Sequence, residues 1–205
     1  MHRQWFSLCI APLIMVVLVC GCTTTAPPGA SPAPLPTAVA LSSTPQTQVP
    51  VSSGPFTLSV DSLVPGSVLP DSCTCNGASE SPLVSWQNVP AGTQSLVLIL
   101  DDPDAPAGTF THWIVYNIPP ATRGIPAAQP NAAALSNGAR QGDNSAGIMG
   151  YFPPCPPPGK PHRYVFTIYA VDTGITPATA DRASISQALT GHTLGQAQFV
   201  TTYGH

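Results

Sequence analysis

The chain of 205 residues is long enough for one folded domain with a signal and a linker, and hardly for two domains. Only 7% of its residues are charged and its formal net charge is −3, which argues against nucleic acid as a partner and against electrostatic attraction to acidic membranes. The 26 prolines and 17 glycines favour loops, turns and strands over long helices.

The N-terminus has the pattern of an export signal. An apolar run from Leu8 to Val19 follows Arg3, and it is short for a membrane span, which needs about 20 apolar residues. The run ends in Cys20-Gly21-Cys22, which resembles the lipobox of prokaryotic lipoproteins. We therefore expect residues 1–21 to be a signal peptide and Cys22 to be lipidated. An ordinary signal peptide and an uncleaved anchor helix are the alternatives, and all three export the domain.

Residues 22–53 form a tract rich in Pro, Thr, Ala and Ser, and no charged residue occurs between Cys22 and Asp61. Such a composition does not bury a core, so we expect an extended and mobile tether between the lipid anchor and the domain. The protein is then expected at the extracytoplasmic face of the cell membrane. The folded domain is predicted to occupy residues 54–205.

Within the domain, the strand predictions follow the hydrophobic pattern in chain order. Phe56–Val60 alternates with period two, as a half-buried strand does. Ser95–Leu100 is a continuous apolar run, which suits a strand buried on both faces. Further strands are predicted from β-branched, aromatic or apolar residues over Pro82–Trp86, His112–Ile118, Arg163–Val171 and Thr193–Tyr203.

One helix is predicted near Asp181–Leu189, where Ile185 and Leu189 fall on one face at i, i+4 spacing and Gly191 follows as a stop signal. Many short strands with a single helix indicate an all-β fold, an antiparallel β-sandwich with one or two short peripheral helices.

Three segments have compositions that are unusual for a scaffold. Asp101-Asp102-Pro103-Asp104-Ala105-Pro106 places three carboxylates after a buried strand and is soon followed by His112-Trp113. The second segment, Gly150–Gly159, contains five prolines between positions 153 and 158, so it is stiff before any ligand arrives. The third, Pro161-His162-Arg163-Tyr164, delivers a histidine at the start of a predicted strand.

Together these segments resemble the phosphatidylethanolamine-binding protein family, in particular its prokaryotic Raf-kinase-inhibitor-like branch, here in lipoprotein form. The resemblance covers nearly all of residues 54–205 in the right order, and the combination of DPDAP, His-Trp and Pro-His-Arg-Tyr is specific where any one of them would be weak. It continues through Ser72–Gly77, Leu83–Trp86, Asn137–Gly142, Gly191–Leu194 and Thr202–Gly204.

The resemblance implies a β-sandwich with Greek-key connections and a small cavity at one end that holds phosphate-type anions, phosphoethanolamine head groups or acetate. Carried over position by position, the ligand-binding residues are Asp102, Asp104, His112, Pro153, Pro154, His162 and Tyr164. The chain departs from the family pattern at Pro153, where relatives usually carry a glycine, and over Gly142–Ser145. Loss of that glycine removes a backbone amide that could face an anion.

These residue types suit an anion because two imidazoles supply donors and gain protons near a negative charge. Asp102 is expected to orient one imidazole or to receive an ammonium group, and Tyr164 adds a hydroxyl donor. The alternative is that His112 and His162 are satisfied by carbonyl groups and bind nothing. His192 and His205 are expected to be structural or exposed to solvent.

Cys73, Cys75 and Cys155 are not all expected to stay reduced in an oxidising compartment. The resemblance places the loops of Cys75 and Cys155 near the pocket, so Cys75–Cys155 is the preferred disulfide, with Cys73 free or paired instead.

The function expected first is a membrane-tethered binding protein for a small anion or a phospholipid head group, without catalysis and without a cofactor. One alternative is an inhibitor or regulator of a partner protein, such as a secreted protease. Another is a metal-dependent hydrolase that uses the histidines and carboxylates, although the chain has no H-x-x-x-H metal motif and no G-x-S-x-G nucleophile motif.

Overall fold

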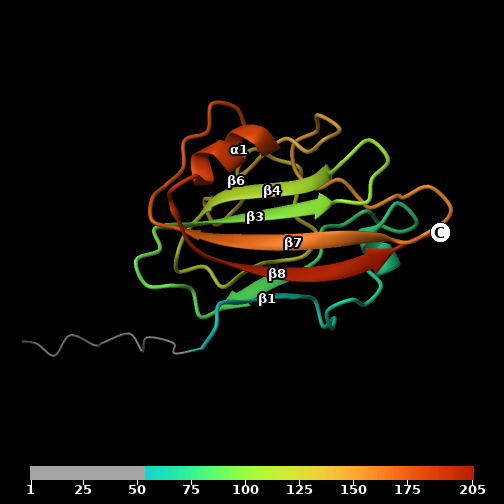
Figure 1. The fold of residues 1–205 in the computed structure, drawn as a ribbon, viewed down its shortest axis with the longest axis horizontal. Coiled ribbons are helices and arrows are strands. Elements are labelled where there is room, and N and C mark those ends of the chain that lie inside the picture. Colours follow the sequence, from blue (N-terminus) through green and yellow to red (C-terminus); the bar gives the residue numbers. More distant parts are fainter. Residues whose placement is uncertain (1–53) are drawn as a thin grey trace, which may run out of the picture. The chain divides into compact units, whose positions relative to one another are not determined.

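The computed structural model describes residues 54–205, which fold into two antiparallel sheets and one α-helix (Figure 1). The predicted signal peptide, the tether and Cys22 lie outside the described residues. The smaller sheet has the order β1 (Thr57–Val60), β2 (Val84–Gln87), β5 (Gly124–Ile125). The larger sheet has the order β6 (Arg140–Gln141), β4 (Phe110–Ile118), β3 (Ser95–Asp102), β7 (His162–Val171), β8 (Thr193–Tyr203).

The helices are short. A 3₁₀-helix, η1 (Asp71–Cys73), precedes β2, and the α-helix α1 (Arg182–Leu189) joins β7 to β8. None of the helices within residues 54–205 has the length and apolar character that a membrane crossing requires. The two antiparallel sheets and the short helices confirm the predicted all-β fold with peripheral helices.

Strand β3 lies at the centre of the larger sheet and is covered on both faces. Leu96, Leu98 and Leu100 pack into the main core together with residues of the smaller sheet, such as Trp86. The residues between them, such as Ile99, pack into a second core with α1. Alternate side chains of a strand point to opposite faces, so a continuous apolar run is what a strand covered by a sheet and a helix requires.

The helix α1 is fixed at its start by a cap and by an ion pair. The Asp181 carboxylate accepts a hydrogen bond from the Ser184 backbone N–H at 2.8 Å, which satisfies a free donor of the first turn. Arg182 Nη2 lies 3.2 Å from Asp101 Oδ2, so the helix is tied to the end of β3. Ile185, with no exposed surface, anchors the helix in the second core.

The antiparallel order brings three distant segments to one end of the larger sheet. Asp102 ends β3 and pairs with Phe110, which begins β4. Because β7 runs antiparallel to β3, its first residue, His162, lies at the same end, opposite Tyr203 of β8. In Figure 1 the loop that leads into β7 and the C-terminus lie together at this end. The topology thus gathers the segments that sequence analysis singled out.

Candidate functional site

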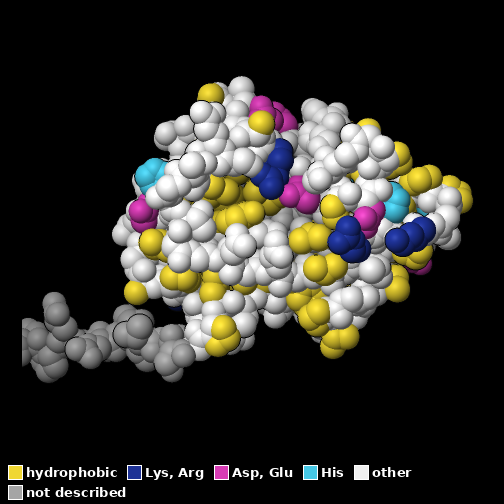
Figure 2. Space-filling view, in the orientation of Figure 1, with side chains coloured by type: hydrophobic (Ala, Val, Ile, Leu, Met, Phe, Trp, Pro, Cys, Tyr) yellow, Lys and Arg dark blue, Asp and Glu magenta, His cyan; other side chains and the backbone are white. Residues whose placement is uncertain are grey.

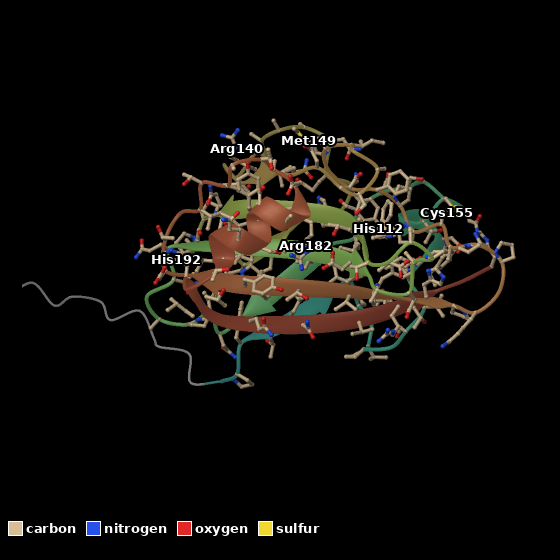
Figure 3. All side chains as sticks on the ribbon, turned by 45° about the horizontal axis from the view of Figure 1, so that its top comes forward. His112, Arg140, Met149, Cys155, Arg182 and His192 are labelled. Atoms are coloured by element: carbon tan, nitrogen blue, oxygen red, sulfur yellow. A yellow bond between two sulfur atoms is a disulfide. The ribbon has the colours of Figure 1, made fainter. Side chains whose placement is uncertain are left out.

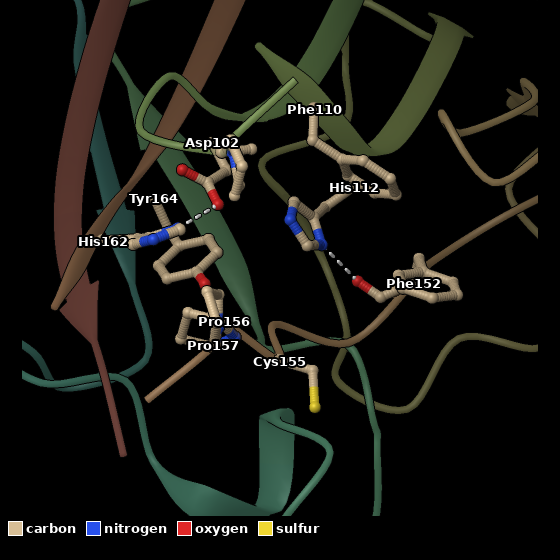
Figure 4. Close-up of a pocket in the computed structure, with 11 residues that line it drawn as sticks. Asp102, Phe110, His112, Phe152, Cys155, Pro156, Pro157, His162 and Tyr164 are labelled. Carbon is tan, nitrogen blue, oxygen red and sulfur yellow. Dashed lines mark hydrogen bonds and ion pairs between the residues drawn. The ribbon is translucent and has the colours of Figure 1, made fainter. Parts of the chain in front are cut away.

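A cavity of about 160 Å³ opens at this end of the sheet (Figure 4). Its walls are mostly aromatic and proline side chains, and its polar atoms come from an aspartate, two histidines and a tyrosine. The lining residues are Asp102, Ala105, Pro106, Phe110, His112, Phe152, Cys155, Pro156, Pro157, His162 and Tyr164. An apolar hollow with a few converging polar groups is the usual form of a small-molecule site, although this one is below the common size range.

His162 is held by Asp102 across neighbouring strands. Its Nδ1 atom lies 2.8 Å from Asp102 Oδ2, and both residues are buried. The other carboxylate oxygen of Asp102 accepts the backbone N–H of Asp104 at 2.9 Å. A carboxylate only accepts hydrogen bonds, so Nδ1 of His162 carries the hydrogen. Its Nε2 has no hydrogen-bond partner within residues 54–205 and remains available to a ligand.

His112 is held by the backbone of Phe152 instead of a carboxylate. Its Nδ1 donates to the Phe152 carbonyl at 2.8 Å, and the Phe152 N–H donates to the His112 carbonyl at 2.8 Å. Burial lowers the pKa of His112 below its usual value. The ring is therefore favoured in its neutral form, with Nδ1 protonated and a lone pair on Nε2.

The hydroxyl of Tyr164 is the one buried side-chain polar atom within residues 54–205 that has no hydrogen-bond partner. Tyr164 is fully buried and lines the cavity, and its ring lies edge-on to that of His112 with centroids 5.3 Å apart. Burial raises the pKa of Tyr164, so the hydroxyl stays protonated and keeps a hydrogen to donate. A buried unpaired hydroxyl is costly, which makes this atom a marker of a missing partner.

The structure brings four of the seven residues implied by the resemblance together around the cavity: Asp102, His112, His162 and Tyr164. Asp104 is not among the lining residues. Its carboxylate accepts hydrogen bonds from Arg163 Nη2 at 2.8 Å and Arg163 Nε at 2.9 Å. These hydrogen bonds hold the pKa of Asp104 well below its usual range. Asp104 therefore braces the turn after β3 at the surface.

The proline wall is also displaced along the chain. Pro153 and Pro154 do not line the cavity, and Pro156 and Pro157 do. The Pro154 carbonyl accepts the Cys75 N–H at 3.0 Å, and the next residue, Cys155, forms the disulfide to Cys75 with an S–S distance of 2.03 Å. Pro154 is thus held against the segment that follows η1. The residues of this loop that line the cavity begin at Cys155. The disulfide preferred from the resemblance is present, and Cys73 is free and buried.

Sequence reasoning did not identify Phe110 and Phe152 as lining residues. Phe110 lies two residues before His112 on β4, so strand alternation puts both side chains on one face, and that spacing was a usable signal. Phe152 reaches the cavity through its reciprocal bonds with His112, which no local pattern indicates.

Metal-ligand geometry does not centre on the cavity. Within residues 54–205 the three groups whose ligand atoms are close enough to share an ion belong to Cys75, Cys155 and His205. The cavity histidines and Asp102 do not form such a group. The metal-dependent hydrolase left open by the sequence gains no support from their geometry.

The fold and the cavity together define a β-sandwich protein with a small cavity at one end of the larger sheet. The family model described as "Phosphatidylethanolamine-binding protein" matches residues 59–204. The chain belongs to the phosphatidylethanolamine-binding protein family.

Individual relatives agree with this membership. A UPF0098 protein of Methanothermobacter thermautotrophicus is 44% identical over 137 residues, covering 66% of this chain and 89% of the relative. LppC of Mycobacterium tuberculosis, whose name describes it as a lipoprotein, is 36% identical over 151 residues, covering 73% of this chain and 72% of the relative. The crystal structure of Escherichia coli YbcL superposes with a TM-score of 0.68 at 31% identity, covering 73% of this chain and 98% of that one.

Proposed function

We propose that the cavity binds a phosphate-type anion, free or as the head group of a phospholipid, and does not transform it. The observation that carries the proposal is the Tyr164 hydroxyl, which is buried without a partner beside the free Nε2 atoms of two histidines. An oxyanion accepts several hydrogen bonds at once, so a single ligand of this class would satisfy the Tyr164 hydroxyl and each Nε2 atom that carries a proton.

The charges around the cavity suit an anion that arrives with a proton or takes one up. Asp102 holds the His162 ring through Nδ1 at 2.8 Å, so Nε2 is the ring atom left to contact the anion. His112 is favoured neutral while the cavity holds no charge, and an anion beside it favours its protonated form. Binding is therefore expected to be coupled to proton uptake at His112.

The size of the cavity limits what it encloses. About 160 Å³ suits a head group and leaves the rest of a larger ligand outside. A second hollow of about 320 Å³ shares Pro157 and His162 with the cavity and is also lined by Lys160. In Figure 2 basic side chains lie among hydrophobic ones at this end of the domain. The second hollow is the proposed path for the remainder of an esterified phosphate.

The cavity offers no activated nucleophile, which favours binding over catalysis. Cys155 is blocked by its disulfide, and Tyr164 keeps its proton because its pKa is raised by burial. The two imidazoles have hydrogen-bond partners but no serine or free thiol beside them among the lining residues.

We further propose that the domain is exported and held at the cell membrane by a lipid on Cys22. The apolar run before Cys20-Gly21-Cys22 supports this, as does the similarity to LppC, a relative that is named as a lipoprotein. A head-group site on a membrane-tethered domain would meet phospholipids without a diffusion step.

Isothermal titration of the purified protein with inorganic phosphate, phosphoethanolamine and glycerophosphoethanolamine tests the binding role. We expect saturable binding at one site, lost in the double variant H112A/H162A. The matched control is His192→Ala, because His192 lies at the opposite end of the domain from His112 (Figure 3) and should leave affinity unchanged. Absence of saturation with all three ligands, or equal affinity in the double variant, would reject the proposal.

A further inference from the structure

Outside the cavity's polar groups, one cluster combines three metal-ligating side chains from distant parts of the chain. Cys75 follows η1, Cys155 belongs to the proline-rich loop, and His205 follows β8. One ligand atom from each lies within 4.8 Å of the other two. Figure 3 shows Cys155 at the same end of the domain as His112.

The position of His205 is set by the residue next to Cys75. Asn76 Nδ2 lies 3.2 Å from His205 Nδ1 and donates to the Tyr203 hydroxyl at 2.7 Å. The ring of Tyr203, a buried residue, lies edge-on to that of His205, with centroids 6.0 Å apart. The end of β8 is thus fixed to the segment that carries Cys75, and the imidazole stays beside the sulfur atoms.

Two thiolates and one imidazole are the donor set that Zn²⁺ prefers, with Zn–S bonds of about 2.3 Å and Zn–N bonds of about 2.0 Å. Ligand atoms around one tetrahedral ion are then about 3.7 Å apart. A separation limit of 4.8 Å among the three atoms leaves only small side-chain rotations to reach that arrangement. The two sulfur atoms must move apart from their bonded distance of 2.03 Å to reach this spacing, so the site requires the disulfide to be reduced.

The disulfide is placed where a reductant can reach it, because Cys155 is exposed and Cys75 is half-buried. A thiolate of a dithiol attacks one sulfur and breaks the S–S bond, and the second thiol of the reductant resolves the mixed disulfide. The dithiol leaves as a disulfide, and its two electrons and two protons remain on Cys75 and Cys155. A bound divalent cation then displaces the two thiol protons.

We infer that reduction of the Cys75–Cys155 disulfide creates a site for a thiophilic divalent cation of the Zn²⁺ class, with His205 as the third protein ligand and solvent in the fourth position. The site uses none of the cavity's histidines, although Cys155 also lines the cavity, and it exists only in the reduced protein. Its function is to exchange a covalent crosslink for a metal crosslink between the same loops.

The test begins with the purified full chain, reduced by a dithiol that is then removed without oxygen. Co²⁺ serves as the probe, because thiolate coordination gives charge-transfer absorption in the near ultraviolet, and Zn²⁺ is added afterwards to displace it. We expect one equivalent of Co²⁺ to bind to the reduced protein with thiolate absorption and to be released by Zn²⁺. Equal binding to the oxidised protein, or no thiolate absorption after reduction, would overturn the inference.

Variants identify the ligands without relying on the disulfide. His205→Ala removes an exposed side chain and is expected to weaken Co²⁺ binding at least about tenfold while the oxidised protein stays folded. His192→Ala is the matched exposed control, and Cys73→Ala tests the remaining thiol of the domain; neither should change the affinity. Unchanged affinity in H205A, or loss of binding in C73A, would contradict the assigned ligand set.

Discussion

The Nδ1 atom of His162 lies 2.8 Å from Oδ2 of Asp102, although the two residues are separated by 60 positions in the sequence. The pair forms because β3 ends where its antiparallel neighbour β7 begins. One hydrogen bond between the strands therefore fixes the tautomer of His162 in the wall of the cavity. We therefore expect Asp102 to contribute to both stability and ligand binding.

Replacement of Asp102 by asparagine tests that role. The neutral amide holds the imidazole of His162 less firmly than the carboxylate does, so phosphate affinity is expected to fall at least about tenfold. Stability is expected to fall by about 2 kcal/mol, since a charge-assisted buried hydrogen bond is weakened. Titration calorimetry and denaturant unfolding measure the two effects.

Asp104→Asn is the matched control for D102N with inorganic phosphate as the ligand, because Asp104 bonds Arg163 at the surface and lines the second hollow but not the cavity. Its phosphate affinity should stay within about twofold of the wild type. A larger loss than in D102N would restore Asp104 to the role that the resemblance gave it and weaken the assignment of Asp102.

Tyr164→Phe separates binding from stability. Removal of a buried hydroxyl that has no partner leaves no group unpaired, so the free energy of unfolding should stay within about 1 kcal/mol or rise. Phosphate affinity should fall about tenfold or more, because a hydrogen bond to a charged ligand contributes about 1.5–3 kcal/mol. Calorimetry and thermal unfolding of Y164F decide the matter. An intact affinity would mean that the hydroxyl faces no ligand.

The pKa of His112 is lower in the folded protein than in the unfolded chain, which has a value of about 6.5. As the pH falls below about 6.5, His112 binds a proton in the unfolded chain but stays neutral in the folded protein. The free energy of unfolding therefore decreases as the pH falls from about 6.5 to the pKa of His112 in the folded protein. The decline should be shallower in His112→Gln, measured by urea unfolding between about pH 7 and pH 5. Identical slopes for the two proteins would count against a depressed pKa at His112.

Bound phosphate is expected to have the opposite effect on the protonation of His112. An anion in the cavity favours protonated His112, so affinity per phosphate mono-anion should rise as the pH falls through the range in which His112 titrates. Asp101, Asp102 and His162 also act on His112 electrostatically, so the comparison with H112Q isolates its share. Affinity that is constant with pH in the wild type would remove His112 from the proton balance.

The pattern of apolar residues was enough to predict the main strands and the helix, because each has a distinct periodicity. Ser95–Leu100 is the clearest case, since its unbroken apolar run corresponds to burial under a sheet on one face and α1 on the other. The two-residue strands β5 and β6 carry no periodicity, and neither they nor η1 could be predicted. Their positions depend on pairing with β2 and β4.

The sequence predicted the cavity residues that lie at strand ends, but not those that lie in the proline-rich loop. Asp102, His112 and His162 lie at or near strand ends, so the topology alone brings them together. Which prolines line the cavity depends on the Cys75–Cys155 disulfide, which fixes the position of the loop. The local sequence pattern does not predict the direction that the chain takes after this disulfide. The resemblance therefore indicated this loop, and the structure lines the cavity with Pro156 and Pro157 of it instead of Pro153 and Pro154.

The proposed lipid anchor is tested by Cys22→Ala in the natural host or a close surrogate. Without the thiol no thioether to lipid forms, so the protein should move from the membrane fraction to the soluble or secreted fraction, and radiolabelled fatty acid should no longer be incorporated. Cys20→Ala is the neighbouring control and should leave labelling intact. Labelling that persists in C22A would contradict the lipobox interpretation.

Reduction of the Cys75–Cys155 disulfide measures how much of the fold depends on it. The bridge joins residues 80 positions apart, and closure of a loop of that length contributes about 4 kcal/mol through the unfolded state. Domains of this size are stable by about 5–15 kcal/mol, so the reduced protein should remain folded with a lower denaturation midpoint. The comparison is urea unfolding of oxidised and reduced protein, with Cys73→Ala to exclude exchange through the third thiol. A midpoint that does not move on reduction would show that the hydrogen bond from Cys75 to Pro154 and the packing of the loop suffice without the crosslink.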